Sequence, residues 1–405
     1  MRIAVCGPVS VPHFQRHLGL SSDAMATLPP GLGGVPVNLL VSELVERGHT
    51  VHVVSWDSTI DRTVSLWKGA LRISLVPGRK KLRDRALDRF TVEREYMTAA
   101  LIDWNPEIVH AHWTYEFALA AKQSNRPHLI TVHDAPMRVL RWQMHPYRLI
   151  RLAMAYQALH GESLVCCVSP YLTRHLRRWG MYRGRTEIIP NGLPDELFER
   201  PVKTYTESEA PTFSTVIMGW GKLKNASVAL LAFHVVRQSL PRARLYMYGE
   251  GYGEGQEAQE WARAHGVEEG VSFRGVRSHE SLMNELQATT DILVHPSFEE
   301  SHGLALVEAM VLGVPVIAGK YSGAVPWTLE EGRAGCLVNV ASAKEVASAM
   351  LRLARDREMR SLLAATGRES AARRFKMMSI AGQYERLYEQ VLALRKPHTV
   401  PYVIS

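Results

Sequence analysis

Two carboxylates, Glu300 and Glu308, are placed where the chain could hold a negatively charged ligand. Residues 291–294 predict a short buried strand, and the apolar residues 304–312 predict a helix. Gly303 lies just before this helix and allows a tight turn. A turn of this kind in an open α/β sheet presents free backbone N–H groups and the positive end of a helix dipole. We therefore expect Glu300 at the mouth of an anion-binding site and Glu308 on the helix beside it.

The segment 295–317, HPSFEESHGLALVEAMVLGVPVI, resembles the E-x7-E signature of retaining glycosyltransferases of the GT-B fold, family 4. In that family the first Glu contacts the transferred sugar and the second hydrogen-bonds the ribose of the nucleotide. The resemblance implies these roles for Glu300 and Glu308. It also implies that donor phosphate and sugar meet the backbone amides of Ser301, His302, Gly303 and Leu304. His302 departs from the family, which has an aromatic or aliphatic residue at this position. Apart from the resemblance, two Glu at this spacing would be ordinary surface residues of a helix.

A second segment of the same half carries Lys222 and Lys224 between a predicted strand and a predicted helix. The family places an Arg and a Lys here to neutralise the two phosphates of the departing nucleotide. Lys224 matches the Lys, whereas the Arg position falls on Gly219 or Trp220. A substitute charge from Lys222, at a shifted position, stays open. The missing Arg leaves both phosphate binding and activity open. Val276 matches the segment that meets the nucleobase, largely through backbone groups.

In the first half, Gly33 and Gly34 match a Gly-Gly pair that in the family opens the first helix and closes over donor phosphates and acceptor. The pair follows the first strand by more than twenty residues, which is too far for a dinucleotide-binding fingerprint. His133 ends a predicted strand, and the family has a His there near the transferred sugar; a structural role stays open. His110 and His112 point the same way on a strand but lack a third metal ligand in evident spacing, so we expect a structural role.

Short apolar strands alternate with helical stretches twice along the 405 residues. This alternation predicts parallel, doubly wound sheets. Strands are predicted at 3–6, 51–55, 73–76, 108–112, 129–133, 164–168, 187–189, 214–218, 244–248, 271–274, 292–294, 316–318 and 336–338. Helices are predicted at 37–45, 91–104, 117–122, 228–238, 255–264, 279–287, 304–312, 343–355, 361–373 and 377–394.

The fold class that follows is α/β, GT-B, with two Rossmann-like doubly wound parallel-sheet domains facing a central cleft. The polar, Pro-bounded segment 201–211 suggests the boundary. We expect an N-terminal acceptor-binding domain at 1–200 and a C-terminal nucleotide-sugar donor-binding domain at 201–376. Residues 377–405 would form a helix that braces the N-terminal domain, followed by a mobile tail at 396–405.

Composition indicates a globular protein, with 46% apolar and 22% charged residues. The start resembles a β-strand rather than a signal peptide, and no stretch reaches the roughly 20 apolar residues of a membrane span. Four cysteines lie in or beside apolar runs, none at C-x2-C spacing, so we expect buried thiols rather than disulfides or a metal site. The expected location is the cytoplasm, with peripheral contact to the inner face of the plasma membrane left open.

The basic excess belongs to one half of the chain. Residues 1–195 hold 24 Lys and Arg against 16 Asp and Glu, a net charge of +8 that equals that of the whole chain. The clusters lie at 79–85 and 138–151, where Arg138, Arg141, His145 and Arg148 would share one helix face if Pro146 did not interrupt it. A solvated surface is the simple account, and attraction to anionic lipid is the sharper one. No nucleic-acid motif accompanies the charge, so nucleic acid is not an expected partner.

The resemblance implies retaining transfer of a hexose-type sugar to a hydroxyl acceptor, with Glu300 as an orienting acceptor of hydrogen bonds and with help from His133. No D-x-D triplet occurs, so we expect no metal and no cofactor. UDP-sugar is favoured over GDP-sugar as donor. The acceptor would be a glycan, a lipid-linked intermediate or a small molecule, in cell-surface polysaccharide, glycolipid or secondary-metabolite biosynthesis.

Three other classes stay open at this stage. A nucleotide-sugar epimerase would share the GT-B fold but need no acceptor. A non-catalytic relative that binds a nucleotide sugar or a protein is motivated by the missing Arg. A nicotinamide oxidoreductase is the general rival for a Rossmann-like chain, and it lacks its fingerprint here.

Overall fold

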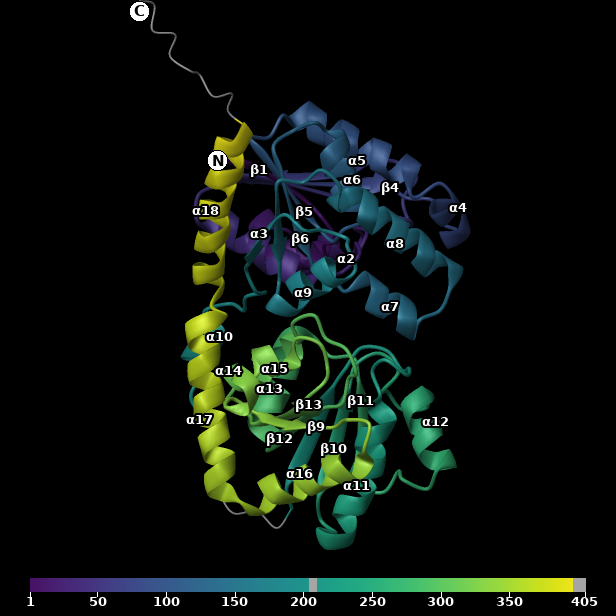
Figure 1. The fold of residues 1–405 in the computed structure, drawn as a ribbon, viewed down its shortest axis with the longest axis vertical. Coiled ribbons are helices and arrows are strands. Elements are labelled where there is room, and N and C mark those ends of the chain that lie inside the picture. Colours follow the sequence, from purple (N-terminus) through teal and green to yellow (C-terminus); the bar gives the residue numbers. More distant parts are fainter. Residues whose placement is uncertain (204–209, 396–405) are drawn as a thin grey trace, which may run out of the picture. The chain divides into compact units, whose positions relative to one another are not determined.

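The structure, a computed structural model, describes residues 1–203 and 210–395. It divides into two compact units (Figure 1). The first unit comprises Met1–Val168, Leu172–Gly192 and the chain from Met377, and the second comprises Ser169–Tyr171 and Leu193–Lys376. The expected tail at 396–405 and residues 204–209 of the expected linker lie outside the described residues.

The first unit is built on an eight-stranded sheet in the order β3-β4-β2-β1-β5-β6-β7-β8. All neighbours are parallel except the edge pair β3 and β4. Strands β1, β5 and β6 are almost fully buried because helices cover both faces, as parallel sheets require. The strands are β1 Arg2–Cys6, β2 Thr50–Asp57, β3 Val64–Lys68, β4 Leu71–Pro77, β5 Ile108–His112, β6 His128–Val132, β7 Leu164–Cys167 and β8 Arg185–Ile188.

Helices α3 and α18 lie on one face of this sheet, and α5 and α6 lie on the other (Figure 1). The apolar side of α18 joins the core of the first unit through Ile380, Tyr384 and Tyr388. The helices of this unit are α1 Gln15–Leu18, α2 Ser22–Ala26, α3 Val35–Glu46, α4 Leu82–Leu87, α5 Thr91–Trp104, α6 Glu116–Gln123, α7 Pro136–Trp142, α8 Pro146–Leu159, α9 Pro170–Arg178 and α18 Met377–Arg395, with a 3₁₀ turn at Val11–Phe14.

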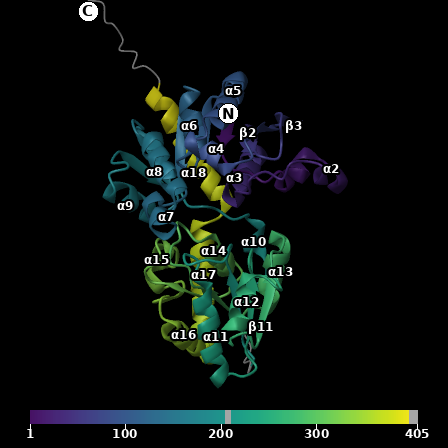
Figure 2. The ribbon, with the colours of Figure 1, turned by 90° about the vertical axis from the view of Figure 1, so that its right-hand side faces the viewer.

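The second unit has a six-stranded, wholly parallel sheet in the order β11-β10-β9-β12-β13-β14. Figure 2 shows α13 and α15 on opposite sides of this unit. Its strands are β9 Thr212–Val216, β10 Arg244–Tyr248, β11 Val271–Gly275, β12 Ile292–His295, β13 Val316–Gly319 and β14 Cys336–Val338. Its helices are α10 Glu196–Glu199, α11 Ala226–Ser239, α12 Glu257–Ala264, α13 His279–Thr289, α14 Leu304–Val311, α15 Val325–Thr328, α16 Ala343–Arg355 and α17 Arg357–Arg374, with a 3₁₀ turn at Glu330–Gly332.

Each sheet has a point at which the strand order reverses. In the second unit the chain runs outward from β9 through β10 to β11 and then returns to β12, which pairs with β9 on its other side. The loops after β9 and β12 therefore leave neighbouring strands at the same edge. Ligands of open α/β sheets bind at this position. In the first unit the corresponding reversal lies between β1 and β5.

The predicted strands and helices are all present, and the α/β class with two Rossmann-like sheets is confirmed. The expected interruption of the 138–151 cluster at Pro146 is confirmed, because α7 ends at Trp142 and α8 begins at Pro146. Proline is accommodated here at the first position of a new helix. Within the described residues, no helix combines the length and the apolarity that a membrane crossing needs. The four cysteines are buried and free.

Candidate functional site

The loop between β12 and α14 is shaped by Gly303. Its φ of +83° is a left-handed conformation that glycine adopts easily, and it forms the N-cap of α14. A Cβ atom at this position would lie 2.7 Å from Leu306 Cδ1. The backbone N–H groups of residues 301–305 have no hydrogen-bond partner among the described residues. These N–H groups lie at the N-terminus of α14, so the loop offers a set of free hydrogen-bond donors at the positive end of the helix dipole.

Glu300 stands in this loop with two partners. Lys224 Nζ donates to its Oε1 at 3.0 Å, and His295 Nε2 lies 3.1 Å from the same oxygen. Burial alone would raise the pKa of Glu300. The charge of Lys224 and the bond from His295 outweigh burial and hold that pKa far below its usual range. Glu300 is therefore an ionised carboxylate at the anion-binding loop.

Lys224 reaches Glu300 because its loop follows β9, the neighbour of β12. Asn225 anchors this loop, since its amide donates to Pro296 O at 3.1 Å and to Val340 O at 2.7 Å. Trp220 occupies one of the two positions where the Arg was expected. Its ring packs on Tyr252 and Trp261, with centroids 6.0 and 5.8 Å apart. The position is thus a hydrophobic anchor, and Lys222 nearby is exposed.

Glu308 is buried on α14 and is held by a residue that sequence analysis did not single out. His279 Nε2 lies 2.9 Å from Glu308 Oε1, and His279 begins α13. This hydrogen bond raises the pKa of His279, against the opposing effect of burial. Val276 lies three residues earlier, directly after β11, and its side chain is 62% exposed. The second unit therefore brings Glu308 and Val276 to the same edge of the sheet as Glu300 and Lys224.

His302, in contrast, turns inward. Its ring is 2% exposed and makes edge contacts with Trp327 and Phe375, at centroid distances of 6.0 and 5.1 Å. Neither ring nitrogen has a hydrogen-bond partner among the described residues. Burial, reinforced by the charge of Arg374, lowers the pKa of His302 to about 3. Only the backbone of His302 can serve the anion-binding loop, together with Ser301 and its neighbours.

The first unit holds Gly33, Gly34 and His133. Gly34 is the N-cap of α3, with a φ of +81°, and a Cβ there would lie 2.1 Å from Pro8 O. The side-chain amide of Asn38 donates to Gly33 O at 3.3 Å, which closes the turn. The backbone conformation at the N-cap of α3 thus requires a glycine at Gly34. Gly33 lies in the turn that starts this helix. Both glycines follow β1, beside the point where the strand order reverses.

His133 is half-buried and stacks on Trp113, with ring centroids 4.3 Å apart. Its Nε2 lies 2.9 Å from His112 Nδ1, and the ring of His112 lies 4.0 Å from that of His110. His110 is held by Tyr388 and Thr131 at 2.8 and 2.7 Å. The role of His110 is therefore structural, as expected. Within residues 1–203 and 210–395, no group of three or more His, Cys, Asp or Glu side chains could hold a metal.

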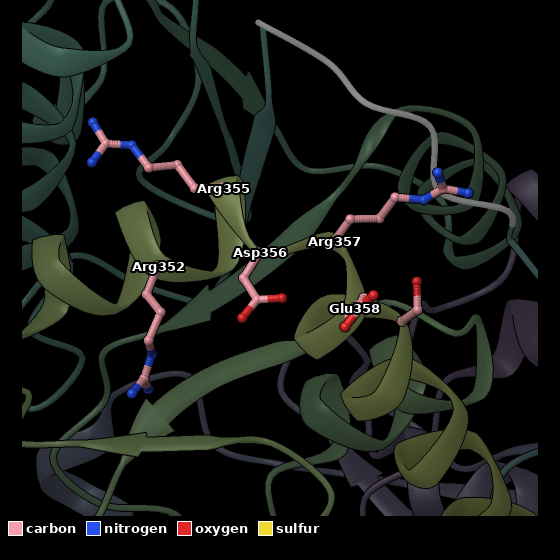
Figure 3. Close-up of a pocket in the computed structure, with 6 residues that line it drawn as sticks. Arg352, Arg355, Asp356, Arg357 and Glu358 are labelled. Carbon is pink, nitrogen blue, oxygen red and sulfur yellow. The ribbon is translucent and has the colours of Figure 1, made fainter.

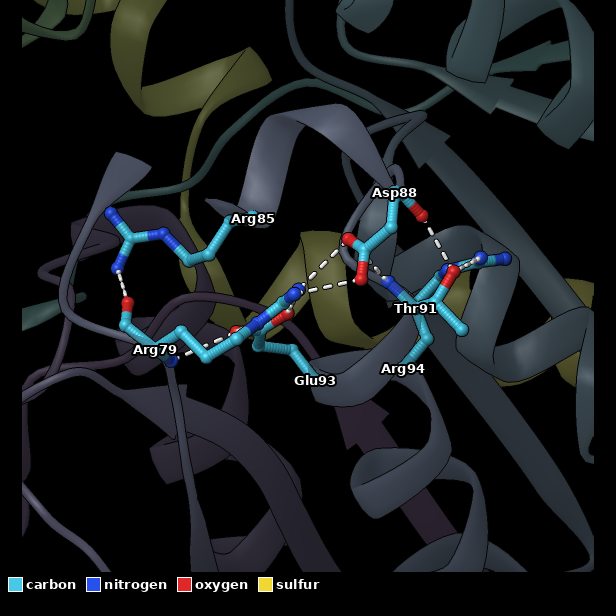
Figure 4. Close-up of polar contacts among 6 residues, drawn as sticks. All are labelled: Arg79, Arg85, Asp88, Thr91, Glu93 and Arg94. Carbon is cyan, nitrogen blue, oxygen red and sulfur yellow. Dashed lines mark hydrogen bonds and ion pairs between the residues drawn. The ribbon is translucent and has the colours of Figure 1, made fainter. Parts of the chain in front are cut away.

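Part of the basic cluster at 79–85 is engaged within the first unit, whereas Lys80, Lys81 and Arg83 are exposed. The guanidinium of Arg79 forms hydrogen bonds to Asp88 at 2.7 and 2.8 Å and to Glu93 at 2.7 and 3.0 Å (Figure 4). Arg85 donates to Arg79 O and lies 4.8 Å over the Trp56 ring. Two of the arginines that suggested lipid binding are therefore engaged within the unit.

Three more polar residues of the first unit were not identified from the sequence. Tyr115 Oη donates to Asp134 Oδ2 at 2.7 Å, and the guanidinium carbon of Arg151 lies 3.6 Å from the centroid of the Tyr115 ring. Burial raises the pKa of Asp134, although Tyr115 and Arg151 oppose the rise. Asp134 directly follows His133, so its position after a predicted strand could have identified it as a candidate site residue. Arg151 lies on α8, nineteen residues after the end of β6 at Val132, and only the fold brings it there.

A hollow of about 800 Å³ lies elsewhere, where α16 meets α17 (Figure 3). Its lining is charged and consists of Arg352, Arg355, Asp356, Arg357, Glu358 and Ser361. Figure 3 shows the arginine side chains pointing outward in different directions. None of the predicted site residues lines this hollow.

Comparison with known families gives a match in each half of the chain. Residues 34–197 match the family described as Glycosyltransferase Family 4, and residues 207–370 match the family described as Glycosyl transferases group 1. The N-acetyl-alpha-D-glucosaminyl L-malate synthase of Bacillus anthracis is 26% identical over 388 residues, which cover 90% of this chain and 96% of that protein. The D-inositol 3-phosphate glycosyltransferase of Corynebacterium kroppenstedtii is 33% identical over 202 residues, covering 47% of this chain and 44% of that protein.

Solved structures show the same fold. Sucrose-phosphate synthase from Thermosynechococcus elongatus superimposes with a TM-score of 0.77 at 19% identity, covering 97% of this chain and all of that one. The Anabaena protein HepE, in complex with UDP and glucose, superimposes with a TM-score of 0.68 at 17% identity, covering 96% of this chain and all of that one.

Proposed function

Because this chain is a glycosyltransferase with the GT-B fold, which moves a sugar from a nucleotide sugar to an acceptor, we propose the course of its reaction. Transfer is retaining and metal-independent, and Glu300 holds the sugar. One observation carries the proposal. Glu300 is ionised and positioned by Lys224 and His295 beside a loop whose amides 301–305 are free. An anionic donor with a hydroxylated sugar matches these groups.

The donor diphosphate binds at the start of α14. The amides of Ser301, His302, Gly303 and Leu304 donate to its oxygens, and Lys224 supplies a cation. Lys224 is hydrogen-bonded to Glu300 in the structure, so donor binding gives each of these two residues a new partner. Lys224 turns to the phosphate, and Glu300 accepts hydrogen bonds from sugar hydroxyls. This exchange leaves neither charge unpaired, which would be costly in a buried site.

The nucleoside end lies at Glu308 and Val276. Glu308 accepts hydrogen bonds from the ribose, and His279 fixes the orientation of its carboxylate. Val276 lies at the edge of the sheet where the base would sit, and its neighbouring backbone supplies the polar contacts. We favour UDP over GDP. The solved structure of HepE with UDP and glucose shows that a protein of this fold accommodates this nucleotide.

In the transfer step, the acceptor oxygen attacks the anomeric carbon on the face from which the phosphate leaves. The bond from that carbon to the phosphate oxygen breaks, the electron pair goes to the leaving oxygen, and the acceptor proton moves to it. Lys224 and the amides stabilise the growing charge on the phosphate. Glu300 orients the sugar through hydrogen bonds and forms no covalent bond to it. The paired-carboxylate mechanism of glycosidases does not apply, because Glu308 serves the ribose.

The first unit supplies the acceptor side. By resemblance to the family, Gly33 and Gly34 at the start of α3 serve the donor phosphates and the acceptor, and His133, held by Trp113 and His112, serves the transferred sugar. The acceptor is a glycan, a lipid-linked intermediate or a small molecule. The malate and inositol-phosphate names of the relatives favour the small molecule. We place the reaction in the cytoplasm, with contact to anionic membrane as a separate prediction.

A thermal-shift panel of UDP, GDP, ADP and TDP, each alone and as common sugar conjugates, tests this proposal. A ligand that binds only the native state stabilises it by roughly 2.7 kcal/mol at a hundredfold excess over Kd. We expect a clear shift with UDP and its sugar conjugate. A flat panel would contradict the proposal and favour a non-catalytic relative, with Trp220 in place of the Arg as the cause.

A further inference from the structure

One stretch of the first unit carries nearly the whole net charge of the chain. Residues 135–183 hold eight Arg, no Lys and a single acidic residue, Glu162, which gives a net charge of +7 where all 405 residues together have +8. The stretch contains helices α7, α8 and α9. Charges of one sign held close together repel one another and attract a partner of the opposite sign.

The fold gathers these helices on one side of the sheet. Strands β5, β6, β7 and β8 are neighbours in chain order, and each pair is parallel. Right-handed crossovers therefore place α6, α8 and α9 on the same face. Figures 1 and 2 both show α7, α8 and α9 next to one another in the first unit. The hydroxyl of Tyr156, on α8, donates to Trp179 O, just after α9, at 2.6 Å, so these two helices meet at one surface.

Most of the arginines on this surface are not neutralised by the unit itself. Arg151 is paired with Glu116, and Arg148 donates to the side-chain oxygen of Gln143. Five others are exposed and have no carboxylate partner among the described residues, namely Arg141, Arg174, Arg177, Arg178 and Arg183. A surface that only has to stay soluble carries charges of both signs interspersed. This one lacks its anions, so an anionic partner would complete it.

Large apolar side chains stand among these cations. Met144, between α7 and α8, is 88% exposed, and Leu149, on α8, is 56% exposed. Tyr156 lies seven residues after Leu149, on the same side of α8, and Trp179 beside it is 42% exposed. A soluble polyanion would leave the aliphatic side chains in water. A bilayer surface accepts the cations at its headgroups and buries the apolar groups beside them, and Tyr and Trp favour this boundary.

We propose that the outer surface of α7, α8 and α9 docks the protein on an anionic lipid bilayer. The arginines of α9 lie against the lipid phosphates, and Leu149 and Trp179 enter the boundary between headgroups and acyl chains. The basic clusters seen in the sequence, at 79–85 and 138–151, do not include α9. The inference goes beyond the proposed function, because it concerns where the protein lies and not which acceptor it uses.

Co-sedimentation of the full chain with vesicles tests this surface. One set of vesicles is phosphatidylcholine alone, and the other contains about one-third phosphatidylglycerol. We expect binding to the anionic vesicles to be at least tenfold tighter and to weaken as salt is raised, because salt screens the attraction. Equal binding to both sets, or binding to neither, overturns the inference. A DNA duplex that binds more tightly than the anionic vesicles also overturns it, because the surface would then serve a nucleic acid.

Replacing the three arginines of α9 locates the effect. Each basic residue near an anionic leaflet strengthens binding roughly fivefold. The triple variant Arg174→Gln, Arg177→Gln, Arg178→Gln should therefore bind anionic vesicles at least tenfold more weakly than the wild type. All three side chains are exposed, so we expect the fold to persist, and an unchanged Tm checks this. Wild-type vesicle binding by this variant would overturn the inference.

A matched control removes the same charge from the second unit. Arg244→Gln, Arg355→Gln and Arg357→Gln together change three exposed arginines and should leave vesicle binding as in the wild type. Equal losses in the two triple variants would show that binding follows net charge and not this surface. Leu149→Gln keeps every charge and should weaken binding severalfold with the same salt dependence. Undiminished binding by Leu149→Gln would show that the apolar side chains stay in water, which contradicts docking on a bilayer.

Discussion

Replacing His302 with leucine should stabilise the protein, and more so at acid pH. The imidazole is 2% exposed, lies between Trp327 and Phe375, and leaves both ring nitrogens without a partner. A buried polar group left unsatisfied costs about 1–3 kcal/mol. Leucine has nearly the same volume and no polar atom, so it removes this cost with little change in packing.

The pH dependence has a definite sign. Burial lowers the pKa of His302 to about 3, whereas an unfolded chain has a histidine pKa of about 6.5. Below pH 6.5 the unfolded state takes up a proton that the folded state refuses, so stability falls with pH. Between pH 7.5 and pH 5.0 this loss amounts to about 2 kcal/mol in the wild type. The leucine variant has no such group and escapes it.

Urea unfolding of wild type and His302→Leu at pH 7.5 and pH 5.0 measures both parts. We expect a gain of about 1–2 kcal/mol at pH 7.5 and about 2 kcal/mol more at pH 5.0. His295→Leu is the matched control, because His295 is also buried but donates to Glu300, and its loss should bring no gain at neutral pH. An advantage of His302→Leu that is equal at both pH values would show that the buried imidazole is not neutral and unpaired, and would refute the reasoning.

Three further predictions concern the donor site and the basic surface. Lys224→Met should slow transfer by about 100-fold, whereas Lys222→Met, at an exposed position, should change it little; equal losses in steady-state kinetics would contradict the assignment. His279→Gln should lower stability near pH 6 but not near pH 9, because Glu308 raises the pKa of His279 and that contribution is lost as pH rises through the raised value; denaturation at both pH values checks this. Met144→Glu should weaken sedimentation with anionic vesicles if the first unit touches membrane, since Met144 is 88% exposed between α7 and α8, and unchanged sedimentation would count against the contact.

Sequence patterns predicted the architecture because its strands are buried on both faces. Runs such as residues 3–6 and 292–294 are apolar and bounded by turn residues, so their strands could be placed within two residues. The edge strand β3, Val64–Lys68, was not predicted, because it is mostly exposed and its composition does not distinguish it from a loop. Pro146 was correctly expected to interrupt a helix, but the two separate helices α7 and α8 on either side of the break were not predicted.

The site was partly predictable for a similar reason. Glu300, Gly303 and Glu308 sit in one continuous segment whose spacing carries the signal. Site residues that come from other segments of the chain carry no such local signal. His279 comes from another helix, and its ion pair with Glu308 depends on how α13 packs, which no local pattern records. The inward turn of His302 likewise depends on aromatic rings far along the chain.

The most direct test of the account is transfer by Glu300→Gln from the sugar nucleotide that the thermal-shift panel identifies, with the anomeric configuration of the product read by NMR. We predict a product that keeps the configuration of the donor and a rate at least about 100-fold below that of the wild type. Glu254→Gln, at an exposed position of the second unit, should keep the full rate. Wild-type transfer by Glu300→Gln, or an inverted product, would contradict the central claim that Glu300 orients the sugar for retaining transfer.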